Sequence, residues 1–587
     1  MELARTVKCN HWVVCSRSMG DVAGFGPEVI QTVRKYALQN AIEYDGEGKS
    51  GSVLGRVLGE RSDLRPHAKN LMILIDDEVE QANSLAKMKG LEVVRDELEG
   101  IDPEALQREK HKKKEGLREL PGDTTNVVLR FAPNPNGPLS IGHSRGVVIN
   151  SSYAEKYDGT IVLRFDDTDT RVKPPLMEAY SWIEEDFEWL SGRSADIVIR
   201  ASERMPVYLD QAKKMIADGH GYVCRCEAEE FRRFREEKTD CPCRGKGVLE
   251  NLEEWSAMNS GTIMEGGAVV RVKTSMDIPN PALRDWPALR IQHSPHPLVG
   301  SKYKVWPLLD FQSAVEDHEQ GVTHIIRGKD LMDSTRKQKL LYEHFGWTYP
   351  ETLYWGRVKV HEFGGFSTSG MLSSIGMGEY EGWDDPRLPT LKALRRRGFE
   401  PQSIISLWNE IGLTQKDISI SMQTLEAFNS KNIDRLCERR FFVCNPIPIE
   451  IRSYDHLSEA RISRHPEGAI QGVRKWGVGN LIYIQEEDLI DGKLRLKDFA
   501  DIEISGSNAE IEGEERSDDR PIIHWLPDVI SRRAKMFVPD GENVRELEGV
   551  IEDFELSVGD VYQFERFGFA KIERINNEVV ELIWLHG

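Results

Sequence analysis

The chain has 587 residues, of which 39% are hydrophobic and 30% charged, with a formal net charge of −20 at pH 7. This length predicts several domains with ordinary apolar cores, and no apolar run approaches the roughly 20 residues that a membrane-spanning helix needs. The first residues, MELARTVKCN, lack the basic-then-apolar pattern of a secretion signal, so we expect a cytoplasmic protein with no membrane partner. The acidity neither supports nor excludes RNA binding, because phosphate contacts depend on local Lys and Arg clusters.

Residues 1–120 are expected to form a helical N-terminal extension that ends in a basic linker. The segment GPEVIQTVRKYALQNAIEY places Val29, Val33 and Ala37 on one helical face. The charged run at Lys110–Lys114, followed by Pro-Gly, is typical of an exposed linker.

The stretch from Val127 to Arg145, VVLRFAPNPNGPLSIGHSR, predicts a strand, a sharp loop and a helix start. Val127–Leu129 are β-branched or large and favour a buried strand. The following prolines and glycine prevent a helix from beginning before Ser140, a suitable N-cap. His143 then lies in the first helical turn, where free backbone N–H groups and the helix dipole favour phosphate. This order is typical of a nucleotide-binding α/β unit, which we assign to residues 121–221.

The segment PNPNGPLSIGH resembles the first signature of class I aminoacyl-tRNA synthetases, in the form used by the glutamyl and glutaminyl enzymes. The resemblance implies that Ser140 and His143 act in catalysis, although Ser140 replaces the first histidine of the signature. It also implies an ATP-binding segment made of Pro133, Asn134, Pro135, Asn136, Gly137, Pro138, Leu139, Ser140, Ile141, Gly142 and His143.

A second strand is expected at Ile161–Phe165, with acidic residues at its carboxyl end. The string RFDDTD resembles the family segment that receives the α-amino group of the amino acid, which makes Asp166 the candidate. Asp167 and Asp169 can equally be read as an acidic turn.

Two Cys-x-Cys pairs flank a predicted helix within residues 222–298. Four thiolates at this spacing are suited to a tetrahedral, structural Zn²⁺ site, and free buried cysteines are the alternative. The resemblance implies that this segment is an inserted domain that binds the acceptor stem of tRNA. The four candidate ligands are Cys224, Cys226, Cys241 and Cys243.

The parallel sheet is expected to resume in residues 299–360, beginning with YKVWPLLDF. In the string THIIRGKD, Arg327 stands where glutamyl enzymes carry arginine and glutaminyl enzymes a small neutral residue. With Arg130 it is expected to bind the side-chain carboxylate of glutamate, and a structural arginine is the alternative reading. Leu309 stands where the family has a tyrosine.

Residues 361–440 predict a mobile loop and a helical connector. Ser367, Thr368, Ser369 and Gly370 form a degenerate version of the second class I signature, which lacks the usual lysine. Lys359 lies upstream of this loop, and the sequence leaves open whether it replaces the missing lysine. The run Arg395–Arg397 is a candidate RNA contact.

Residues 441–587 alternate with period two between Gly and Asn turns, which predicts antiparallel β-barrels. The resemblance implies an anticodon-binding region. Arg474, Lys475 and Trp476 are candidates for contacts with splayed bases.

The predicted fold is therefore a multidomain α/β protein with a class I Rossmann-type catalytic domain. The resemblance covers nearly the whole chain and is to the archaeal type of glutamyl-tRNA synthetase. It implies ligation of L-glutamate to tRNA(Glu) through glutamyl-adenylate, with ATP and Mg²⁺ as the substrate complex and AMP and diphosphate as products. Charging of tRNA(Gln) stays open. The alternatives are a glutaminyl-tRNA synthetase, against which Arg327 argues, and a non-catalytic tRNA-binding paralogue.

Overall fold

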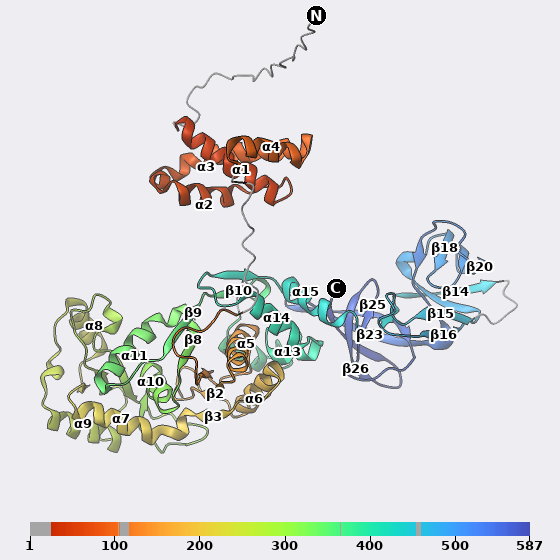
Figure 1. Cartoon of the computed structure of the whole chain (residues 1–587). Helices are drawn as coiled ribbons and strands as arrows, with labels where there is room; N and C mark the ends of the chain where they lie inside the picture. The colour runs from red at the N-terminus through yellow and green to blue at the C-terminus, as the bar shows by residue number, and fades with distance from the viewer. Residues whose placement is uncertain (1–24, 104, 106–116, 364–365, 453–458) are drawn as a thin grey trace, which may run out of the picture. The chain divides into compact units, whose positions relative to one another are not determined.

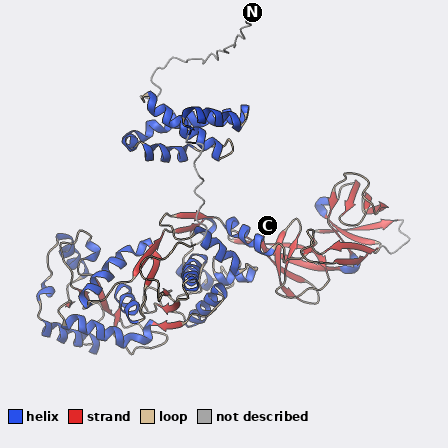
Figure 2. Cartoon of the chain, viewed as in Figure 1, coloured by secondary structure: helices blue, strands red, loops and turns tan. Residues whose placement is uncertain are grey.

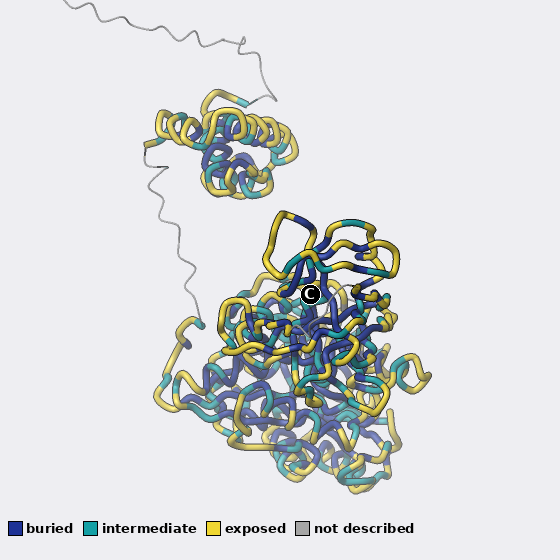
Figure 3. Tube along the Cα trace, turned by 90° about the vertical axis from the view of Figure 1, so that its right-hand side faces the viewer, coloured by how far each residue is buried: buried dark blue, intermediate teal, exposed yellow. Residues whose placement is uncertain are grey.

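A computed structural model of the chain describes residues 25–103, 105, 117–363, 366–452 and 459–587 (Figure 1). The chain divides into two compact units, Met1–Glu115 and Gly116–Gly587. The predicted basic run at Lys110–Lys114 lies outside the described residues. In each unit the buried residues lie inside and the exposed residues cover the outside (Figure 3).

The first unit is helical, as predicted. Its helices are α1 (Pro27–Glu43), α2 (Ser50–Glu60), α3 (Ala68–Lys89) and α4 (Leu91–Ile101). The predicted apolar face of α1 is buried against the other helices. On the same helix, Arg34 pairs with Glu78 of α3 at 3.0 Å and with Glu97 of α4 at 2.8 Å, which fixes the crossing of three helices.

The second unit begins with a parallel α/β core. Strands β1 (Val128–Phe131), β2 (Thr160–Phe165) and β3 (Ile197–Arg200) form one sheet, and β8 (His324–Gly328) and β9 (Glu351–Trp355) pair in parallel. The N–H of Thr323 donates to the carbonyl of Val128 at 3.0 Å, so β8 continues the sheet beside β1. The accompanying helices are α5 (Ile141–Lys156), α6 (Met177–Ser191) and α11 (Met332–Phe345).

A second group of elements lies between β3 and β8. It contains the helices α7 (Met205–Ala217), α8 (Ala228–Glu237), α9 (Val248–Ser260) and α10 (Leu309–Glu319). Its antiparallel sheet consists of β4 (Gly221–Cys224), β5 (Val269–Val272), β6 (Pro287–Ile291) and β7 (Val305–Pro307).

The expectation that YKVWPLLDF resumes the parallel sheet is wrong. Val305 pairs with Ile291 in antiparallel register, so this segment is the last strand of the inserted sheet. The turn that returns the chain is closed by reciprocal backbone hydrogen bonds between His296 and Gly300, at 3.0 and 2.8 Å. A short apolar run carries no information on which of two sheets it joins, which explains the error.

A connector follows the parallel core. Strands β10 (Val358–Val360) and β11 (Ile418–Ile420) pair in parallel. Between them in the chain lie the helices α12 (Thr368–Gly376), α13 (Leu391–Arg397) and α14 (Pro401–Ile411), and α15 (Met422–Ile433) follows β11. Among the helices described, none has both the length and the hydrophobicity needed to cross a bilayer.

Strands dominate the rest of the chain (Figure 2). One seven-stranded sheet has the order β12-β25-β26-β27-β23-β24-β13 and a second has the order β21-β18-β19-β20-β14-β17-β22, with β15-β16 as a separate hairpin. Most pairings are antiparallel, as predicted, and four are parallel. The bounds are β12 (Arg439–Arg440), β13 (Phe442–Cys444), β14 (Pro446–Arg452), β15 (Glu459–Ser463), β16 (Val473–Gly477), β17 (Leu481–Gln485), β18 (Gly492–Leu496), β19 (Asp501–Ser505), β20 (Asn508–Gly513), β21 (Ile522–Ile523), β22 (Trp525–Pro527), β23 (Ser531–Asp540), β24 (Asn543–Glu552), β25 (Val561–Phe564), β26 (Gly568–Ile575) and β27 (Val580–His586).

The last strand, β27, packs against the connector. Leu585 belongs to the same buried cluster as Leu394 of α13. The guanidinium of Arg397 donates to the Leu585 carbonyl, and Asn429 of α15 is hydrogen-bonded to His586 at 3.0 Å. The connector and the last strand therefore share one core, although their contacting residues Arg397 and Leu585 are 188 residues apart.

Candidate active site

A cavity of about 1140 Å³ opens at the carboxyl ends of the parallel strands. Its wall includes Arg130 at the end of β1, His143 in the first turn of α5, Asp166 directly after β2, Arg327 near the end of β8, and Ser367–Ser369 at the start of α12. Ligands of open α/β sheets bind at this edge. The structure thus brings residues that are far apart in the sequence to one cavity.

Ser140 and His143 shape the start of α5. Ser140 has extended backbone angles, with φ −109° and ψ 169°, and its N–H donates to Nδ1 of His143 at 3.2 Å. The hydroxyl of Ser140 lies 3.1 Å from the same nitrogen. Desolvation by the surrounding protein and the charge of Lys173 both lower the pKa of His143, which favours the neutral imidazole.

Gly137 allows the loop before α5 to touch the start of α12. A Cβ atom at this position would lie 2.6 Å from the methyl carbon of Thr368 and 3.0 Å from the ring of Trp383. Contacts this short would force Thr368 and Trp383 to shift, so the glycine lets these two predicted signature segments approach each other this closely. Ser367 caps α12 by accepting a hydrogen bond from the Gly370 N–H at 3.1 Å. Lys359, in contrast, is exposed on β10 and is not among the cavity-lining residues.

Three arginines and two carboxylates form a charged cluster at the cavity, which we call the arginine cluster (Arg130, Arg164, Arg327, Asp166 and Asp317). All but the buried Asp317 line the cavity. Arg164 pairs with Asp166 at 2.8 Å and with Asp317 at 2.7 Å, and Nε of Arg130 lies 3.2 Å from Asp317. Burial alone would raise the pKa of Asp317, but the three guanidinium groups lower it, so the carboxylate is charged. The cluster carries one more positive than negative charge.

Arg327 has neutral partners. One of its terminal nitrogens donates to the Gln338 side-chain carbonyl at 2.8 Å and to the Tyr349 hydroxyl at 3.1 Å. Its Nε is buried without a hydrogen-bond partner among the described residues. A buried guanidinium with a spare donor favours an anion or water beside it, because an unsatisfied charged donor is costly.

Sequence reasoning missed the residues that orient this cluster. Gln312 donates to Asp166 at 2.9 Å, and both Gln312 and Asp317 come from α10. Nothing in the apolar pattern of that helix separates them from ordinary polar residues. Leu309, at the start of the same helix, lines the cavity with an apolar side chain that offers no hydrogen bond.

Asp167 does not lie in an exposed acidic turn. Its carboxylate is fully buried and accepts hydrogen bonds from the Tyr180 hydroxyl at 2.6 Å and from the backbone and hydroxyl of Ser202, both at 2.7 Å. Asp169 lines the cavity and pairs with Arg290 at 2.9 Å. Asp167 is thus a structural residue that fixes the loop after β2.

Asp186 of α6 is hydrogen-bonded to the loop before α5. Its carboxylate accepts a hydrogen bond from the Leu139 N–H at 3.1 Å and lies 3.3 Å from Arg395. Burial raises the pKa of Asp186 to about 7 despite the nearby guanidinium.

The arginines of α13 do not form a free RNA-binding run. Arg395 faces Asp186, Arg396 pairs with Glu573, and Arg397 is buried against β27. The basic run instead joins α13 to its neighbours, which the sequence could not show because the partners are distant in the chain.

The proposed base contacts in the β-rich region are also corrected. Trp476 is buried, and Arg474 is fully buried in a 2.6 Å pair with Glu552. Lys475 is exposed and pairs with Glu459 at 2.9 Å. Because the first two side chains face the core, they cannot stack on RNA bases.

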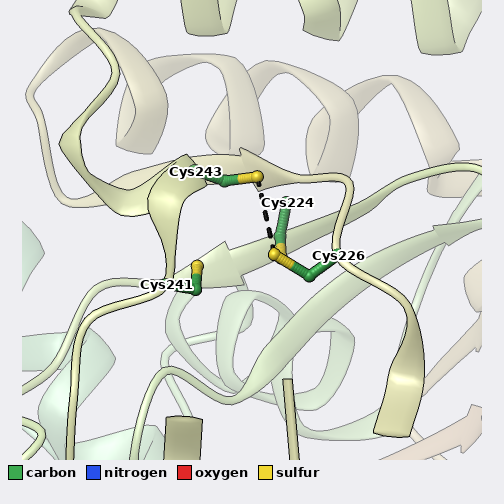
Figure 4. A group of neighbouring side chains, drawn as sticks. All are labelled: Cys224, Cys226, Cys241 and Cys243. Atoms are coloured by element: carbon green, nitrogen blue, oxygen red, sulfur yellow. Dashed lines mark hydrogen bonds between the residues drawn. The ribbon is translucent and has the colours of Figure 1, made fainter. Parts of the chain in front are cut away.

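The four predicted cysteine ligands come together (Figure 4). Their sulfur atoms all lie within 4.8 Å of one another, and those of Cys226 and Cys243 are 3.8 Å apart. The Arg225 N–H donates to the Cys243 sulfur at 3.3 Å. A tetrahedral site with Zn–S bonds of about 2.3 Å has sulfur atoms about 3.8 Å apart, so the donor set fits such a metal.

Comparisons with known proteins show which proteins this chain is similar to. Residues 126–435 match the catalytic domain of class I tRNA synthetases (E and Q), and residues 437–517 match the anti-codon binding domain of the same group. The chain is 43% identical over 579 residues to a glutamate--tRNA ligase of Methanosarcina mazei, covering 95% of this chain and 99% of the relative. It is 44% identical over 559 residues to a glutamate--tRNA ligase of Archaeoglobus fulgidus, covering 94% and 98%. A solved glutamate-tRNA synthetase of Elizabethkingia anophelis aligns with 53% of this chain and 71% of its own, at 19% identity and a TM-score of 0.38.

Proposed function

The chain belongs to the family of class I tRNA synthetases for glutamate and glutamine, and from this premise we propose that it ligates L-glutamate to tRNA(Glu) with ATP. In the first step the α-carboxylate of glutamate attacks the α-phosphorus of ATP and pyrophosphate leaves. In the second step the acyl group passes from glutamyl-adenylate to the 2′-hydroxyl of the terminal adenosine, and AMP leaves.

The excess positive charge of the arginine cluster is the observation that carries the choice of glutamate. Arg130 and Arg327 line the same cavity as His143, and Nε of Arg327 is a buried donor without a partner among the described residues. We assign the γ-carboxylate of glutamate to these two guanidinium groups. The neutral amide of glutamine at this place would leave a buried guanidinium without a counter-charge, which costs about 3 kcal/mol or more.

The other roles follow from position. Asp166, held by Arg164 and Gln312, receives the α-amino group. The start of α5, with Ser140 and His143, binds the phosphates of ATP through backbone and side-chain donors. Catalysis is then mostly orientation and charge stabilisation, with no covalent enzyme intermediate. Mg²⁺ enters with ATP and neutralises phosphate charge.

The cysteine group is proposed to hold a structural Zn²⁺. Four thiolates leave no open coordination position, and the group belongs to the inserted sheet and its helices, outside the cavity wall. The metal would join β4 to the turn after α8. Its role would be to stabilise the inserted domain. The family resemblance implies that this domain binds the acceptor stem of tRNA.

Pyrophosphate exchange with glutamate or glutamine, each with and without tRNA(Glu), tests this proposal. We expect exchange with glutamate. Exchange with glutamine alone would make the protein a glutaminyl enzyme, and exchange with neither would favour a tRNA-binding paralogue. Charging of purified tRNA(Gln) with glutamate, measured in the same preparation, decides whether the tRNA specificity is relaxed.

A further inference from the structure

The loop that carries the second class I signature contains no cation. Residues 366–378 read FSTSGMLSSIGMG, without Lys or Arg. Departure of pyrophosphate concentrates negative charge on its oxygens, and fixed positive groups at that place lower the barrier. If the reaction follows the proposed function, a protein cation that assists the Mg²⁺ bound to ATP has to come from elsewhere in the cavity.

Six Lys and Arg side chains line the cavity, and Lys173 differs from the other five. Four of the six are ion-paired: Arg130, Arg164, Arg290 and Lys337. Arg327 is hydrogen-bonded to Gln338 and Tyr349. Within the described part of the chain, Lys173 has neither an ion pair nor a hydrogen-bond partner for its ammonium group.

The loop that carries Lys173 is joined to the loop before α5 at both of its ends. The N–H of Asp166 donates to the Pro133 carbonyl at 3.0 Å, and the N–H of Leu176 donates to the Pro135 carbonyl at 2.9 Å. Two prolines follow Lys173 directly and restrict its backbone. The lysine is therefore held beside the predicted phosphate-binding loop, while its side chain is exposed to the cavity.

Lys173 is also electrostatically coupled to the phosphate end of the site. Its charge contributes to the lowered pKa of His143, at the N-terminus of α5. The same charge would attract the triphosphate that this helix start receives.

We propose that Lys173 binds the β- and γ-phosphates of ATP and stabilises the leaving pyrophosphate, in place of a signature-loop lysine. This inference rests on the proposed function. As an oxygen of the glutamate α-carboxylate bonds to the α-phosphorus, the bond to the bridging oxygen breaks and its electron pair stays on pyrophosphate. The ammonium group of Lys173 neutralises that charge, and no proton needs to be transferred.

Three variants of the full-length protein test the proposal: Lys173→Met, Lys173→Arg and, as a matched control, Lys359→Met. We expect Lys173→Met to lower the kcat of glutamate-dependent pyrophosphate exchange, with tRNA present, by about 10²-fold. Lys173→Arg should retain most of the activity because the charge remains. Lys359→Met should behave as wild type, since Lys359 lies outside the cavity wall.

Binding measurements separate phosphate recognition from a structural role. Lys173→Met should weaken ATP binding but leave AMP binding unchanged, because AMP lacks the β- and γ-phosphates. Equal losses for ATP and AMP, or exchange within about twofold of wild type, would overturn the role of Lys173. Wild-type protein that shows no glutamate exchange would instead overturn the proposed function, and this inference with it.

Discussion

Replacement of Arg327 by methionine tests the charge argument for glutamate most directly. The change removes the one positive charge by which the arginine cluster exceeds its carboxylates. It also removes the hydrogen bonds that Arg327 donates to Gln338 and Tyr349, whereas the bond from the Tyr349 hydroxyl to Gln338 remains. The methionine side chain matches the aliphatic part of arginine and fills most of the space that Arg327 leaves. The main effect is therefore loss of a charge-assisted contact with the substrate.

The magnitude follows from the burial of the site. A hydrogen-bonded charged contact contributes roughly 1.5–3 kcal/mol, and a buried charge left without its partner costs roughly 3–5 kcal/mol. Taking about 3 kcal/mol, kcat/KM for glutamate should fall by about 10²-fold in Arg327→Met. Arg327→Lys should lie between this variant and wild type, because lysine keeps the charge but not the planar fork.

Exchange kinetics with glutamate and glutamine, together with ATP binding, measure the effect. ATP affinity should stay within about twofold of wild type, because Arg327 is assigned to the amino acid and not to the phosphates. Arg290→Met is the matched control, since Arg290 lines the same cavity but pairs with Asp169 and is partly exposed. Unchanged glutamate kinetics in Arg327→Met, or an equal loss in Arg290→Met, would refute the assignment.

Three further changes have specific expected outcomes. Because the pKa of Asp186 is raised to about 7 when folded, the folded state binds its proton more tightly, and stability should fall as pH rises from about 4 to about 7. Asp186→Asn should remove this pH dependence of the free energy of unfolding, which is about 1.4 kcal/mol per pH unit. Thermal unfolding of both proteins across this pH range measures the effect, and melting temperatures that change in parallel would contradict it. Cys241→Ser should abolish bound zinc, measured by elemental analysis, and lower the melting temperature; wild type without zinc would disprove the metal assignment. Gly137→Ala should slow glutamate exchange at least about tenfold, because its methyl group would meet Thr368 and Trp383, and wild-type rates would show that this contact is dispensable.

Local signals in the sequence predicted the local parts of the site. The strand, proline-rich loop and Ser140 cap required only neighbouring residues, and the two Cys-x-Cys pairs needed only one intervening helix. Prediction failed where a partner lies far along the chain. Arg474 was assigned to RNA because its partner Glu552 is 78 residues away. Asp317 was overlooked for the same reason, since its arginines come from β1 and β2.

The sheet assignment of β7 shows a different limit. Val305–Pro307 is too short for its periodicity to distinguish a parallel from an antiparallel strand. The decisive feature was the return turn between His296 and Gly300, which joins β7 to β6 through backbone hydrogen bonds. Backbone pairing of this kind leaves little trace in side-chain composition.

The packing of β27 on the connector affects how the protein must be made. Leu585 and His586 of β27 contact α13 and α15, whose contacting residues Arg397 and Asn429 are synthesised 188 and 157 residues earlier. Until these residues emerge, the nascent chain exposes the apolar surface that Leu585 covers. We therefore expect the connector to mature only after translation of the β-rich region, so that a stalled or truncated chain would be a target for chaperones and proteases.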